Sequence, residues 1–284
     1  MKVVGTATSL LFVCLSCVNV APASEWLDDY GHAMSQAKES QRMLLVYFCE
    51  AGQSQKDDTL ARKLIEESTL RPLVEKHVLV RVPTTQKARV NGDEIQLIRH
   101  SSFSELRGQA GMAVIDFHDP QSRYYGHVVS VYPLHLPGAR TTKNMAALLS
   151  LPSGSLTQRS LVLAVRIHPE GPASTDGVFL TTLAKESESH SLHQARITHQ
   201  GHHNWESRFH RISSQLPGGM LAEEVSADSW PGTGLMDAGL DVVQSGRHSS
   251  GHWNAVRGRQ RYYGYDMKRG RNGIWYATGI FSSR

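Results

Sequence analysis

Hydrophobic and polar positions in the first half of the chain follow two different periods. Continuous apolar runs predict four strands, at 42–48, 77–82, 111–117 and 124–132. Apolar residues three or four positions apart predict three helices, over 26–37, 57–68 and 142–149. Residues 84–110 show neither period. The pattern therefore predicts helices and strands packed around a largely buried sheet.

The second half has its own order of elements. A strand is predicted over 160–168, and after a turn a helix follows, with Asp176 as its N-cap and its end near Thr198. One face of that helix carries mostly small side chains, which let a helix lie close to a sheet: Leu180, Ala184, Ser187, Ser191 and Ala195. The remaining predicted elements are a helix over 235–244 and a hairpin of strands 262–267 and 274–281.

Length and composition favour two folded domains. The chain has 284 residues, 40% of them hydrophobic and 20% charged, which favours packed cores over global disorder. Pro, Gly, Ser and Thr accumulate in 133–160. We therefore expect one domain over 25–150, a linker over 151–160 and a second domain over 161–284.

The N-terminus has the composition of a signal peptide. Lys2 precedes an uncharged stretch, 3–24, that ends with the small-residue pattern Ala21-Pro22-Ala23. We expect cleavage after residues 1–24 and export to the periplasm or the medium, with an uncleaved membrane anchor as the alternative. No other stretch is apolar over 18 residues, so the mature chain is not expected to be an integral membrane protein. It would keep Cys49 as its only cysteine and form no internal disulfide.

The predicted order of elements over 25–150 resembles a thioredoxin-like domain. The resemblance includes the segment 37–48, which leads into the position of that fold's active-site loop. Here the loop reads Cys49-Glu50-Ala51-Gly52, without the second cysteine that resolves a mixed disulfide. We therefore expect a redox-inactive domain in which Cys49 is a small buried hydrophobic residue.

Three polar clusters follow one another in the second half, at 201–208, 222–227 and 249–254, and each contributes a histidine or a carboxylate. Together with the terminal hairpin they resemble the CAP superfamily (cysteine-rich secretory proteins, antigen 5 and pathogenesis-related 1). The matching motifs are His202-x-x-Trp205-x-x-Arg208, Glu224-Val225-Ser226-Ala227, Ser249-Ser250-Gly251-His252 and the 261–281 hairpin. The resemblance implies an α/β/α sandwich over roughly the last 110 residues, so the whole chain is expected to be an α/β protein.

His202, Glu224 and His252 are the candidate site residues. Two histidines and a glutamate form a known zinc shell, and the resemblance implies a cleft whose paired histidines can hold a divalent cation. Glu224 can bind such a metal or accept a hydrogen bond from a histidine. Glu223 is the alternative carboxylate, and hydrogen bonding without a metal is the alternative role for the cluster. Other histidines lie nearby in sequence and are expected to be exposed: His199, His203, His210 and His248.

The function that these features favour is binding through this cleft by an exported protein, with an extracytoplasmic glycan, lipid or protein as ligand. The alternative is a metal-dependent hydrolase that uses the same three residues. Arginines interleave with Tyr262, Tyr263 and Tyr265, a pattern that can bind nucleic acid. In an exported chain we expect instead a hairpin with its tyrosines packed inward and no nucleic-acid partner.

Overall fold

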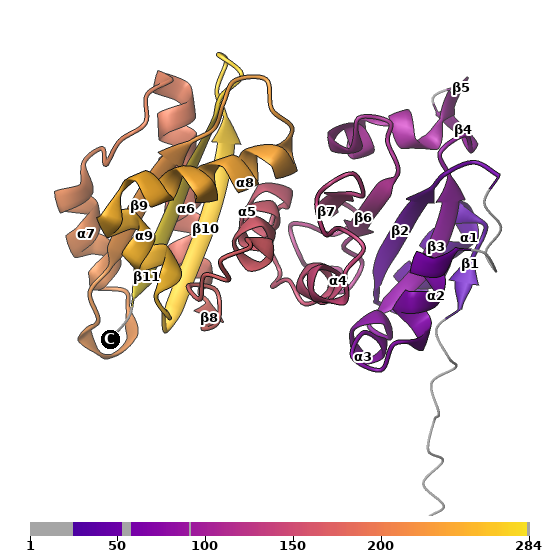
Figure 1. The fold of residues 1–284 in the computed structure, drawn as a ribbon, viewed down its shortest axis with the longest axis horizontal. Coiled ribbons are helices and arrows are strands. Elements are labelled where there is room, and N and C mark those ends of the chain that lie inside the picture. The colour runs from indigo at the N-terminus through magenta and orange to yellow at the C-terminus, as the bar shows by residue number, and fades with distance from the viewer. Residues whose placement is uncertain (1–24, 53–57, 91, 283–284) are drawn as a thin grey trace, which may run out of the picture.

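The structure is a computed structural model that describes residues 25–52, 58–90 and 92–282 (Figure 1). Its helices and its mixed parallel and antiparallel sheets confirm the predicted α/β class. The predicted signal peptide, 1–24, lies outside the described residues. Among the residues described, no helix is long and apolar enough to cross a bilayer.

A five-stranded sheet organises the first half, in the order β1-β3-β2-β6-β7. The strands are β1 (Trp26–Leu27), β2 (Met43–Cys49), β3 (His77–Pro83), β6 (Gly111–Ile115) and β7 (Val128–Pro133). β1, β3 and β2 run parallel, whereas β6 and β7 are antiparallel. The four strands predicted from apolar runs are confirmed, with β7 four residues shorter at its start.

Four helices accompany this sheet: α1 (Tyr30–Glu39), α2 (Thr59–Glu66), α3 (Arg71–Val74) and α4 (Thr142–Leu149). Polar side chains cap three of them, because Asp29, Asp58 and Thr141 each accept a hydrogen bond from a backbone N–H of the first turn. The unassigned segment 84–110 forms a hairpin of β4 (Lys87–Val90) and β5 (Asp93–Gln96), followed by the 3₁₀ helices η1 (Leu97–Arg99) and η2 (Ser101–Leu106).

A four-stranded sheet organises the second half, in the order β8-β10-β11-β9. Its strands are β8 (Val178–Phe179), β9 (Glu223–Asp228), β10 (Tyr262–Arg269) and β11 (Trp275–Ser282). β10 and β11 form the predicted antiparallel hairpin. Tyr263 and Tyr265 are buried in it, as expected. β9 lies at an edge of the sheet, which leaves its outer side open to residues from other segments.

The helices of the second half are α5 (Leu156–Ile167), α6 (Thr181–Ile197), α7 (Trp205–Ser213), α8 (Leu235–Ser245) and α9 (Ser250–Arg257), with the 3₁₀ helices η3 (Pro217–Gly219) and η4 (Gly246–His248). The strand predicted over 160–168 is wrong, since these residues lie in α5. Ser155 begins that helix with a reciprocal capping box to Gln158. The run 158–165 is buried on every side, so it carries no helical period that the sequence could show.

Helix α6 begins four residues later than an N-cap at Asp176 predicts, because Val178 and Phe179 first pair with β10. Its small face packs on the sheet as expected: Ser187 donates a hydrogen bond to the Gly264 carbonyl at 3.0 Å. The approach is so close that a Cβ on Gly264 would lie 2.2 Å from the backbone nitrogen of Ala184. α5, α8 and α9 cover the opposite face (Figure 1).

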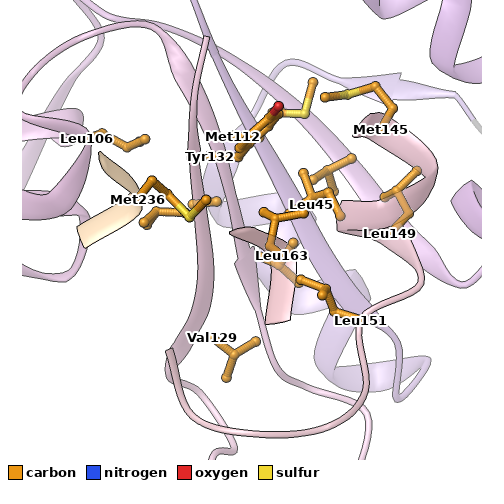
Figure 2. Close-up of a cluster of buried hydrophobic side chains, with 14 of the residues drawn as sticks. Leu45, Leu106, Met112, Val129, Tyr132, Met145, Leu149, Leu151, Leu163 and Met236 are labelled. Atoms are coloured by element: carbon orange, nitrogen blue, oxygen red, sulfur yellow. The ribbon is translucent and has the colours of Figure 1, made fainter. Parts of the chain in front are cut away.

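One hydrophobic core continues from the first sheet into the second half. Figure 2 shows part of it between the two halves, with Leu163 of α5 and Met236 of α8 in the same cluster as Leu45, Met112 and Met145. The segment 151–160, expected as a linker, contains the start of α5, and Gln158 and Arg159 in it are buried. The two-domain division stays a prediction.

Candidate functional site

The three predicted site residues lie in three different segments of the second half. α6 ends at Ile197, its C-cap Thr198 turns the chain away with a φ of 53°, and His202 lies in the loop before α7. Glu224 is the second residue of the edge strand β9. His252 lies in the first turn of α9. Ser249 caps this helix by accepting a hydrogen bond from the His252 backbone N–H at 3.5 Å.

The fold brings the three side chains together in a chain of contacts. His202 Nδ1 lies 3.0 Å from Glu224 Oε1, and His202 Nε2 lies 3.1 Å from His252 Nε2. Because Nδ1 and Nε2 are on opposite sides of an imidazole, Glu224 lies behind His202 as seen from His252. The glutamate is therefore placed to orient a histidine, which is one of the two roles that the sequence left open.

Glu224 is held as a buried anion. Its side chain is 1% exposed, and Arg208 Nη2 of α7 forms an ion pair with Oε2 at 2.6 Å. Burial by itself would raise the pKa of the Glu224 carboxyl, but hydrogen bonds from His202 and Arg208 outweigh it and lower that pKa. The neighbouring Glu223 is exposed, so Glu224 is the carboxylate of this cluster.

The charge on Glu224 decides the tautomer of His202. A carboxylate only accepts, so Nδ1 of His202 carries the proton and its Nε2 presents a lone pair toward His252. Burial and the neighbouring His202 lower the pKa of His252, which favours neutral imidazole there. The cluster can thus exist as a hydrogen-bonded pair or as two lone pairs that face one cation.

The distance between the two nitrogens fits a shared cation. Ligands at about 2.0–2.1 Å from a tetrahedral zinc ion lie roughly 3.3 Å apart, close to the 3.1 Å between the two Nε2 atoms. In the described part of the chain, however, no group of three or more His, Cys, Asp or Glu side chains is arranged to hold a metal ion. A cation here would have two protein ligands, with Glu224 behind one of them.

Two residues that sequence reasoning did not assign to the site also contact Glu224. Arg208 forms the ion pair, and it belongs to the motif that carries the family resemblance. His190 of α6 is buried, with Nδ1 3.4 Å from Glu224 Oε2 and 3.1 Å from Thr278 Oγ1. Burial lowers the pKa of His190 to about 4, so it is neutral at pH 7. Nothing in the sequence distinguished His190 from the other polar residues of α6.

The other nearby histidines do not join the pair. His199, His210 and His248 are exposed, as expected, whereas His203 is half-buried and its Nε2 faces the carbonyl of His199 at 3.3 Å.

No protein-family model matches the chain, and comparisons with curated proteins and with solved structures gave no significant match. The thioredoxin-like and CAP resemblances therefore stay predictions that rest on the motifs quoted above.

Proposed function

We propose that this chain is an exported binding protein with a CAP-like second half, and that it captures an extracytoplasmic ligand at the His202–His252 pair. The observation that carries the proposal is the 3.1 Å separation of two Nε2 atoms from residues 50 positions apart. A buried carboxylate fixes the tautomer of one of them. Such outer-sphere orientation is typical of histidines that bind metals.

A divalent cation, with zinc as the first candidate, fits between the two nitrogens. When bound, it would offer open coordination positions to a carbonyl or an anionic group of the ligand. The chain's own contribution is to orient the two imidazoles toward each other, with Glu224 behind His202. Ser249, the serine that begins the motif containing His252, caps α9. A cation at this pair would have two protein ligands, one fewer than catalytic zinc sites usually have, so binding is favoured over metal-dependent hydrolysis.

Zinc titration by calorimetry tests the proposal. Wild type is expected to bind one zinc ion, and His202→Ala and His252→Ala are each expected to lose most of the affinity, because one imidazole rarely holds zinc. The double variant should be little worse than either single one, since the two side chains act as a unit. His210→Ala, an exposed histidine of α7, is the matched control and should bind as wild type does.

A shared site would be refuted if the losses of zinc-binding free energy in the two single variants add up to the loss in the double variant. Undetectable zinc binding by wild type at pH 7 would leave the hydrogen-bonded pair as the role of the cluster. Export is tested separately, by mass spectrometry of the native protein: a mature chain that begins near Ser24 is expected, and an intact Met1 in the cytoplasm would contradict it.

A further inference from the structure

The second half also has a hollow whose lining does not include the histidine pair. It has a volume of about 400 Å³ and is formed by the end of β9, the turn 229–233, the last turns of α8, and η4. This volume falls within the range of roughly 300–1,000 Å³ that small-molecule sites occupy. α8 contributes Asp241, Gln244 and Ser245 to its lining.

Trp230 stands at this groove with its side chain in solvent. It is 74% exposed, the most exposed of the large hydrophobic side chains in the described residues. A single exposed apolar residue is ordinary in a mobile loop. Whether the exposed Trp230 side chain marks a binding surface therefore depends on how firmly its loop is held.

The turn that carries Trp230 is fixed from three sides. Ser229 N and Gly232 N donate to the carbonyls of Trp275 and Gly273 at 3.0 and 3.1 Å. The hydroxyl of Thr233 donates to the carbonyl of Trp230 at 2.9 Å. These bonds hold the backbone in place, so the indole is presented to solvent by a rigid support.

The first half of the chain braces the same turn. Arg107 Nη2 donates to the Gly232 carbonyl at 3.1 Å, and the carboxylate of Glu105 accepts from the backbone N–H of Leu235, the first residue of α8, at 3.1 Å. Because the backbone of this turn is already ordered, binding at Trp230 has to order only the side chain, which lowers the entropy cost of binding.

Polar groups of both kinds line the groove beside the indole. Asp228 and Asp241 supply acceptors. His168 contacts the amide oxygen of Gln244 at 3.1 Å, and this contact leaves the Gln244 amide N–H₂ group as a donor. The groove thus combines one flat apolar face with fixed donors and acceptors.

We propose that this groove binds a neutral saccharide, with one sugar ring on the face of Trp230 and its hydroxyls bonded by Asp228, Asp241 and Gln244. A sugar ring has an apolar face of C–H bonds and an edge of hydroxyls that both donate and accept, and the groove offers the complement of each. An organic cation would also find the two carboxylates. It would, however, favour a cage of several Trp, Tyr or Phe rings, and Trp230 is the single residue of these types among the described lining residues.

The test is calorimetric titration of the full mature chain with chitotriose, cellotriose and maltotriose, up to about 10 mM, which corresponds to weak but measurable binding. At least one trisaccharide is expected to bind. Trp230→Ala should weaken it roughly tenfold or more, the usual effect of removing a stacking face, and Trp230→Phe should restore most of the affinity. Asp241→Asn and Gln244→Ala should each weaken binding. Leu221→Ala, at a 65% exposed apolar residue elsewhere on this half, is the matched control.

Failure of all three trisaccharides to bind overturns the proposal, as does equal binding by wild type and Trp230→Ala. Binding of tetramethylammonium without any trisaccharide would also overturn it and assign the groove to a cation. The titrations are run in EDTA and repeated with His202→Ala, where unchanged affinity is expected. The saccharide proposal for the groove and the metal proposal for the histidine pair can therefore be refuted independently. Far-ultraviolet circular dichroism confirms that each variant is folded.

Discussion

Arg159 Nε donates a hydrogen bond to Ser130 Oγ at 2.7 Å, and this bond joins α5 to strand β7 across the boundary between the two halves. The guanidinium is 2% exposed, and its Nη1 also donates to the carbonyls of Leu151 and Pro152. Burial lowers the pKa of Arg159 to about 10. One buried cation thus satisfies three oxygens where the halves meet.

Arg159→Met is expected to lower the free energy of unfolding by about 3 kcal/mol, because buried oxygens that lose their donor cost about 1–3 kcal/mol each. Urea denaturation monitored by circular dichroism measures the loss. Arg166→Met, on the same helix but half-buried, is the control and should cost no more than about 1 kcal/mol. Equal losses in the two variants would contradict the role assigned to Arg159.

Gly264→Ala is expected to separate α6 from the sheet. The new Cβ would lie 2.2 Å from the Ala184 backbone nitrogen, so the helix must move, at a cost of about 1–3 kcal/mol or more. Gly251→Ala in α9 meets nothing within 4 Å and is expected to be neutral or slightly stabilising. Thermal unfolding of both variants measures the difference, and an unchanged midpoint for Gly264→Ala would show that α6 packs less closely.

Glu224→Gln is expected to weaken zinc binding about 10- to 100-fold without removing a ligand, because the orienting charge behind His202 is lost. The amide oxygen can still accept from His202, but the ion pair with Arg208 is gone. Calorimetry gives the affinity. Glu223→Gln, at the exposed neighbour, should leave it unchanged; equal affinity in Glu224→Gln and wild type would remove Glu224 from the site.

Stability is expected to fall in mild acid through His77. Burial lowers the pKa of this histidine to about 4, against an ordinary value of about 6.5. Between these values the unfolded chain binds a proton that the folded chain does not, so the free energy of unfolding decreases as the pH falls from about 6.5 to 4. The loss is at most roughly 3 kcal/mol for this group.

Urea titrations at several pH values measure this slope. His77→Gln should show a shallower slope, with the remainder coming mainly from His190, whose pKa is lowered in the same way. His199→Gln, at an exposed histidine, should keep the slope of wild type. A His77→Gln slope equal to that of wild type would be the contrary result.

Cys49 is expected to be chemically inert in the folded protein. It is fully buried in β2, and burial raises the pKa of its thiol, so little thiolate is available. A chromogenic disulfide reagent should label the mature chain slowly in buffer and at one thiol per chain in urea. Rapid labelling in buffer, or insulin reduction that Cys49→Ser abolishes, would contradict a redox-inactive first half.

Local sequence determined most elements of the fold. The apolar runs around Val46 and Val80 predict strands without reference to the rest of the chain, because a strand covered on both faces needs little else. The small face of α6 and the turn between β10 and β11 are also local. Where burial extends around a whole helix, as in α5, the period disappears and the local prediction fails.

The site depended on the tertiary structure in a different way. The sequence identified His202, Glu224 and His252 as candidates, but only the fold places Nε2 against Nε2 and puts Glu224 behind His202. Arg208 and His190 join the site because α6 and α7 converge on the edge strand, and the Trp230 turn is rigid because residues from the first half brace it. Such contacts join residues far apart in the chain, and no local pattern of hydrophobicity or propensity encodes them.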